Sequence, residues 1–235
     1  ITGTEVSKDA AAMILSDDNF ATIIGAVLNG RNVYRNIKNA IQFLLSGNLA
    51  AIIAVLFCSI ASLPVPFKPV HLLFINLLTD SLPALAIGME PVDKSLLKEK
   101  PRNPKEGILT KDFLIRLAFY GGLISVSTLT AFYIGLGTDS GLASTMAFAV
   151  LTQARLFHGF NCRSDKSLAA IGIKSNMWSV GAFVLGTLLM LALMLPVLRP
   201  FMEVSALDMT HIGYIAVLSV IPTVIIQIIR LIRGK

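Results

Sequence analysis

The stretch VHLLFINLLTDSLPALAIG, from Val70 to Gly88, decides the fold because it is apolar enough to cross a membrane yet carries a carboxylate. A membrane-spanning helix needs about 20 mostly apolar residues, and this stretch has that length. Asp80 lies in its middle, where a charge costs about 2.5–3.5 kcal/mol on insertion scales. We therefore expect Asp80 to be buried against groups that offset this cost.

The whole chain has the composition of a polytopic membrane protein. Its 235 residues are 54% hydrophobic and 14% charged, with a mean hydropathy of +0.74. Soluble domains are about 25% charged. We predict an all-α membrane protein, a bundle of six transmembrane helices at Ile41–Leu63, Val70–Gly88, Phe113–Leu136, Leu142–Phe160, Trp178–Leu198 and Ile212–Ile232.

The net charge of +6 comes from basic residues between the apolar runs. They precede the first run and follow the second, fourth and sixth, whereas the other three connections carry one lysine or arginine at most. By the positive-inside rule, both termini of this segment are predicted to be cytoplasmic. The positions of the basic residues thus account for the net positive charge. We do not expect the protein to bind nucleic acid.

The first 30 residues differ from the rest, and we expect them to be the edge of a larger cytosolic domain. Since the chain begins with Ile1, we expect a segment of a longer polypeptide. Thr2 and Glu5 have the spacing of a helix-capping box, Met13–Leu15 is short enough for one strand, and Asp17 or Asp18 is predicted to cap the next helix.

Residues 31–63 contain no proline and one glycine, Gly47. We predict a single rod of roughly 50 Å, against a hydrocarbon core of about 30 Å, so that part of it projects from the membrane. Two separate helices meeting at the membrane surface are the alternative. The domain boundaries are therefore 1–30, 31–63 for a stalk plus its transmembrane helix, and 64–235 for five further helices and their loops.

Two further oxygen-bearing side chains stand close to Asp80 in the sequence. Asn76, Thr79 and Asp80 are spaced i, i+3 and i+4, so they are predicted to share one helix face. Calcium takes six to eight oxygen ligands, and these residues supply only some of them. Asn48 on the preceding span is predicted to add another. Alternatively, Asp80 pairs with an arginine that holds two helices together.

Arg155 is the second charge within an apolar run. It stands near the cytoplasmic end of its span, where it can either extend to the interface or point inward to Asp80. In the second case its positive charge occupies space that a second cation would use.

The stretches TGTEVSKDAAAMILSDDNFATI, NLLTDSLPALAIGMEPVD and KPRNPKEGIL together resemble P-type ATPases, in particular the calcium pumps of the sarco/endoplasmic-reticulum type and their bacterial relatives. The resemblance implies that the six spans are the family's fifth to tenth helices. It also implies that Asn76, Thr79, Asp80 and Asn48 match ion-binding residues.

The same resemblance places the first residues at the end of the α/β phosphorylation domain. The phosphorylated aspartate, the nucleotide-binding and actuator domains and the first four helices would then precede Ile1, together with the sites for magnesium and ATP. The expected partners are the lipid bilayer and this remainder of the pump. No catalytic residue is expected in this segment, and the intact protein is expected to be a calcium-transporting ATPase in the cell membrane.

Two departures from the two-calcium pumps affect one ion site. A glutamate three residues after the fifth-helix asparagine is Ala51 here, and a glutamate of the eighth helix is Arg155. A guanidinium in place of a carboxylate repels a divalent cation. We therefore expect a pump that binds one calcium ion per cycle, with Arg155 as a permanent countercharge and Asp80 as the group that carries protons back.

Other classes remain open. A manganese-transporting relative uses similar oxygen ligands. A six-helix channel or secondary transporter would have two similar halves, and INLLTD has no second copy in the last three spans. A membrane scaffold held by an Asp80–Arg155 pair is a further alternative.

Overall fold

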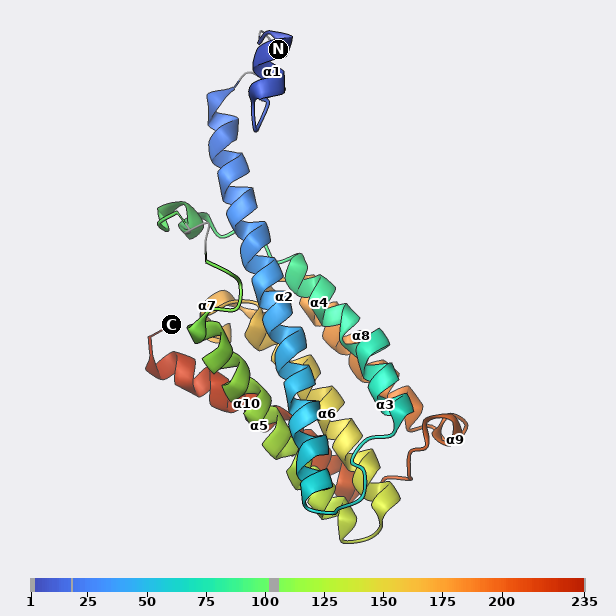
Figure 1. Cartoon of the computed structure of the whole chain (residues 1–235). Helices are drawn as coiled ribbons and strands as arrows, with labels where there is room; N and C mark the ends of the chain where they lie inside the picture. The colour runs from blue at the N-terminus through green and yellow to red at the C-terminus, as the bar shows by residue number, and fades with distance from the viewer. Residues whose placement is uncertain (1–2, 18, 102–105, 235) are drawn as a thin grey trace.

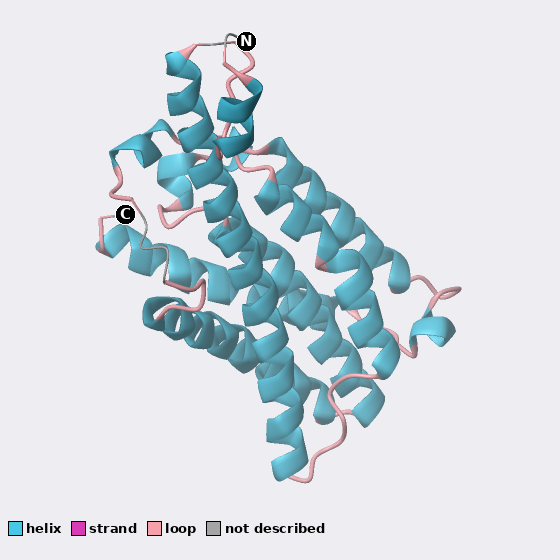
Figure 2. Ribbon diagram, turned by 45° about the horizontal axis from the view of Figure 1, so that its top comes forward, coloured by secondary structure: helices cyan, strands magenta, loops and turns pink. Residues whose placement is uncertain are grey.

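The computed structural model describes residues 3–17, 19–101 and 106–234. Within these ranges every regular element is helical, and the long helices form one bundle, as Figure 1 and Figure 2 show. The elements are α1 (Glu5–Ala10), α2 (Phe20–Ile60), α3 (Pro69–Phe74), η1 (Ile75–Thr79), α4 (Ser81–Gly88), η2 (Lys94–Lys98), α5 (Lys111–Leu136), α6 (Ser140–Cys162), α7 (Leu168–Ile171), η3 (Ile173–Ser175), α8 (Met177–Leu193), α9 (Arg199–Met202) and α10 (Met209–Ile232).

Helix α2 is a single rod of 41 residues, or about 60 Å at 1.5 Å per residue. It projects beyond the other long helices at the end nearest the N-terminus (Figure 1). The prediction of one continuous helix is confirmed, although it begins at Phe20 rather than at Arg31. Asn19 caps it by accepting a hydrogen bond from the Ala21 amide.

The predicted details before α2 need correction. Asp17 does not cap α2, because it accepts instead from the Asn19 amide and the Thr22 hydroxyl, and Asp18 lies outside the described residues. Thr4 caps α1 through the Ser7 amide, whereas Thr2 lies outside the described residues. The predicted strand at Met13–Leu15 is wrong, since these residues form no regular element.

Helix α6 lies at the centre of the bundle. It packs against α2, α4, α5, α8 and α10, and 18 of its 23 residues are buried. Because its neighbours surround it, α6 tolerates serine, threonine, asparagine and arginine without exposing them to lipid. Gln153 on α6 donates to the Thr187 hydroxyl on α8 at 3.0 Å, so that this polar side chain links two helices.

By length and composition, four helical stretches of the described residues are suited to crossing a membrane. They are Phe20–Ile60, Pro69–Gly88, Lys111–Leu136 and Met209–Ile232. The remaining two predicted spans are also helical, but they do not belong to this set of four. Helix α8 is too short, with 17 residues, and α6 is long enough but carries many polar side chains, which its neighbours bury.

The connections divide between the two ends of the bundle. The α4–α5 and α6–α8 connections and the C-terminus lie toward the end from which α2 projects (Figure 1). The α2–α3, α5–α6 and α8–α10 connections lie toward the opposite end. The basic connections therefore share one end of the molecule, as the charge pattern predicts.

Candidate ion-binding site

The helix that carries Asp80 is interrupted at that residue. α3 passes into the π-helical turn η1, and the Asp80 amide donates to the Ile75 carbonyl, five residues back, at 2.9 Å. Pro83 lies three residues on and has no amide hydrogen to continue the ladder. Such π-helical turns are frequent at functional sites. The interruption ends at Asp80, whose side chain is buried.

Arg155 of α6 joins Asp80 to α2. Its Nη2 forms an ion pair with Asp80 Oδ2 and donates to Asn48 Oδ1 at 3.1 Å. Arg155 is 1% exposed, so it does not extend to the membrane interface. The alternative in which it does so is therefore wrong, and one guanidinium connects three helical segments.

Gly47 makes this arrangement possible. A Cβ atom at this position would lie 2.3 Å from Arg155 Nε, so any larger side chain would displace the guanidinium. Sequence reasoning treated Gly47 only as a residue that a helix tolerates. Nothing in the sequence indicates its role, because that role depends on which side chain crosses α2 at this point.

Two polar atoms of the ion pair have no hydrogen-bond partner within the described part of the chain. They are Asp80 Oδ1 and Arg155 Nε, and both are buried. Buried polar atoms are nearly always satisfied, so each exception calls for an explanation. A free carboxylate oxygen at the break of a helix is the kind of ligand that a hard cation accepts.

The other predicted ligands do not all converge on Asp80. Asn48 and Asn76 are exposed, and only Asn48 is linked to the pair, through Arg155. The Thr79 hydroxyl is buried but donates to the Ile75 carbonyl at 3.1 Å. Asn76 is exposed, whereas Thr79 and Asp80 are buried, and the π-helical turn η1 changes the regular spacing on which the prediction of a shared face relied.

Ala51 lies in an apolar part of α2 and provides no ligand. It belongs to a buried cluster with Ala50, Ala54 and Phe148. No group of three or more His, Cys, Asp or Glu residues able to hold a metal ion occurs in the described ranges. Among the predicted site residues that the structure describes, hydrogen bonds and an ion pair join only Asp80, Asn48 and Arg155 to one another.

A cavity of about 510 Å³ opens elsewhere, between the projecting part of α2 and the ends of α5, α6 and α10. Arg31, Arg35, Gln42 and Arg230 are among the residues that line it, and neither Asp80 nor Arg155 is. Sequence reasoning missed this cavity, which forms only where four separate segments meet.

Comparison with known proteins identifies the family. Residues 64–232 match the family model described as cation transporting ATPase, C-terminus. The chain is 41% identical to calcium-transporting ATPase 1 of Bacillus cereus, and the alignment covers 98% of this chain and 28% of that protein. It is 33% identical to human calcium-transporting ATPase type 2C member 1, with 97% of this chain and 25% of that protein covered.

A calcium-transporting ATPase of Listeria monocytogenes is 40% identical, over 99% of this chain and 27% of its own length. The chain thus spans about a quarter of the length of these relatives. By the family match over most of its length, the chain belongs to the cation-transporting ATPases and corresponds to their C-terminal, membrane-embedded region.

Proposed function

We propose that this chain is the C-terminal membrane part of an ATP-driven calcium export pump that binds one calcium ion per cycle. The observation that carries the proposal is the buried Asp80 carboxylate, with Oδ2 paired to Arg155 and Oδ1 free of any described partner. The relatives named as calcium-transporting ATPases support calcium as the transported ion.

The single-ion proposal rests on charge. Asp80 is the only acidic side chain in the fully buried set of the described residues, and Arg155 lies against it. With Oδ2 paired to Arg155, only one oxygen of this carboxylate, Oδ1, is free of a described partner, and a positive charge lies beside it. Ala51 contributes no oxygen on its side of the site. We infer that Arg155 keeps a second cation out.

The rest of the site comes from outside this chain in our proposal. Asn48 and Asn76 are exposed here, and their amide oxygens are available to a neighbour. Helices that precede this segment in the intact pump would cover them and complete the six to eight oxygens that calcium requires. Residues 1–30 would belong to the phosphorylation domain, and α2 would carry its movement to Asp80.

Proton counter-transport is the second part of the proposal. After calcium leaves, Asp80 is a buried carboxylate whose Oδ1 has no partner among the described residues, and binding of a proton there would remove the cost of burying its charge. From the basic connections and the positive-inside rule, we infer that the projecting end of α2 lies in the cytoplasm. Calcium would then leave the cell across its membrane.

The test is calcium uptake by inverted vesicles that contain the intact pump, with Asp80→Asn and the exposed Asp112→Asn as its matched control. We expect Asp80→Asn to abolish uptake and Asp112→Asn to retain it. Uptake that survives Asp80→Asn contradicts the proposal.

Manganese added in competition separates the two cations: stronger inhibition of uptake by manganese than by unlabelled calcium would point to a manganese pump.

A further inference from the structure

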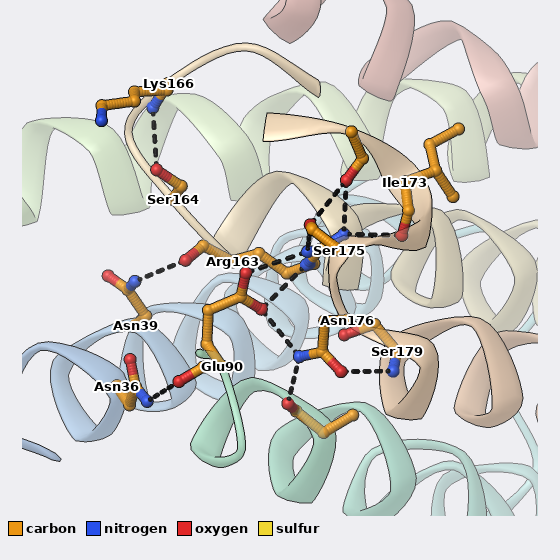
Figure 3. Close-up of polar contacts among 12 residues, drawn as sticks. Asn36, Asn39, Glu90, Arg163, Ser164, Lys166, Ile173, Ser175, Asn176 and Ser179 are labelled. Carbon is orange, nitrogen blue, oxygen red and sulfur yellow. Dashed lines mark hydrogen bonds and ion pairs between the residues drawn. The ribbon is translucent and has the colours of Figure 1, made fainter. Parts of the chain in front are cut away.

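Arg163 is buried at the end of the bundle from which α2 projects. It is 0% exposed, and its Nε and Nη2 atoms donate to both carboxylate oxygens of Glu90, each at 2.9 Å. Its Nη1 donates to the Ile173 carbonyl at 3.1 Å and its Nη2 to Ser175 Oγ at 2.5 Å (Figure 3). The guanidinium thus fixes Glu90 to the connection between α6 and α8.

Glu90 is held from α2 as well. Its carbonyl oxygen accepts from Asn32 Nδ2 at 3.2 Å and from Asn36 Nδ2 at 3.0 Å. Asn176, at the start of α8, donates to Glu90 Oε2 at 2.7 Å and to the Ala86 carbonyl at 2.9 Å (Figure 3). We call Asn32, Asn36, Glu90, Arg163 and Asn176 the Glu90 cluster.

The Glu90 cluster lies at one end of α4, and Asp80 lies at the other. α4 has eight residues, or about 12 Å, and is short enough to move as a rigid unit. The π-helical turn η1 directly before Asp80 interrupts the regular ladder and offers a place where the chain can deform. A displacement of α2 that pulls on the Glu90 carbonyl would therefore reach Asp80.

We propose that Glu90 and Arg163 are positioning residues that couple the movement of α2 to the ion site at Asp80. This inference rests on the proposed function. The main chain of Glu90 is held by α2, while its carboxylate is anchored to the end of α6 through Arg163 and to the start of α8 through Asn176. Bidentate arginine–carboxylate pairs fix orientation as well as distance, which suits an anchor of this kind.

A purely structural ion pair would behave differently. Its loss would lower the stability of the pump without changing how many ions move for each ATP. A coupling pair changes that ratio, because α2 can then move while α4 stays behind. The number of calcium ions transported per ATP hydrolysed therefore distinguishes the two roles.

The experiment compares Glu90→Gln with Asp165→Asn in the intact pump in vesicles. Glutamine keeps the shape of Glu90 and removes its charge. Asp165 pairs with Arg116 near the same end of the bundle, but both side chains are partly exposed and the pair does not touch α4. We expect Glu90→Gln to lower the ratio of calcium to ATP at least about twofold and to weaken apparent calcium affinity at least about fivefold, the lower end of typical coupling between sites. Asp165→Asn should match the parent.

A folded Glu90→Gln pump with the parental ratio and affinity overturns the inference. If Glu90→Gln does not fold, the double variant Asn32→Ala/Asn36→Ala decides, since it removes both hydrogen bonds from α2 to the Glu90 carbonyl and keeps the ion pair. An unchanged ratio in that variant also overturns the inference. Failure of the proposed function appears separately, as transport that survives Asp80→Asn.

Discussion

At position 47 the side chain is a single hydrogen atom, and the Arg155 guanidinium lies where a methyl group would be. A glycine is required at this position of α2, because Arg155 passes against it to pair with both Asn48 and Asp80. The charge pair at the centre of the site thus depends on a residue that carries no charge.

We predict that Gly47→Ala destabilises the pump by about 1–3 kcal/mol, the usual range for overpacking. The added methyl group has to displace Arg155 from Asp80. Gly122→Ala, with nothing within 4 Å of its Cβ, is the matched control and should be neutral or slightly stabilising. Thermal melting of the intact protein measures both. The effect should shrink in an Arg155→Gln background, and equal behaviour of the two alanine variants would refute the contact.

Asp93 gives a prediction about pH. Hydrogen bonds from the Ser95 side chain and amide, followed by the ion pair with Lys166, hold the pKa of Asp93 well below its usual value of 3.8. Because the pKa of Asp93 is lower in the folded state than in the unfolded state, the ionised carboxylate stabilises the folded state at any pH above the unfolded-state pKa. This stabilisation is lost as the pH falls toward the folded-state pKa. The melting difference between the parent and Asp93→Asn should therefore stay constant from pH 7 to pH 5. A difference that disappears in this range would contradict the assignment.

Sequence and structure agree unevenly at the scale of single residues. Asp80 and Arg155 stand out in the sequence because each is a charge within an apolar run. Gly47 and Glu90 do not stand out, since their roles depend on groups 108 and 73 residues away that the fold brings to them. The exposure of Asn76 next to a π-helical turn was also not apparent, because regular α-helical spacing was assumed across η1.

Helices α5 and α6 approach each other closely at Gly135. A Cβ atom at Gly135 would lie 2.6 Å from the Ala143 Cα atom. Backbone cannot move aside as a flexible side chain can, so this glycine sets the distance between the two helices. Small residues allow such close approach in membrane bundles.

We therefore predict that Gly135→Ala lowers the stability of the pump by about 1–3 kcal/mol through separation of α5 from α6. Gly181→Ala on α8, where nothing lies within 4 Å, serves as the control. Detergent-solubilised protein heated in the presence of calcium gives both melting temperatures. A Gly135→Ala protein that melts with the parent would show that the helices can separate without cost.

The helical elements were predictable because hydrophobic runs of this length have few other solutions in a membrane. The continuous α2 followed from the absence of proline between residues 31 and 63. Hydropathy alone gave no indication that α6 is the central helix, since a buried helix and a lipid-facing helix differ in what surrounds them. The π-helical turn was not predicted, because a nearby proline can also kink a helix or be accommodated.

The whole bundle exposes many large apolar side chains, among them Ile52, Leu56, Leu73, Leu185 and Val217. A bilayer would cover such a surface, and so would the helices that we propose to precede this segment. The basic connections and the projecting part of α2 lie toward one end (Figure 1). The molecule thus has an apolar body suited to a membrane and a charged end, at which the proposed cytosolic domains would act on α2.

The measurement that tests the central claim is equilibrium calcium binding to the intact pump, counted per polypeptide, with Asp80→Asn and Arg155→Glu alongside. The account predicts one calcium ion in the parent and none in Asp80→Asn. Arg155→Glu restores a carboxylate beside Asp80 and should allow a second ion to bind. Two calcium ions in the parent pump would contradict the account, because Arg155 would then not exclude the second cation.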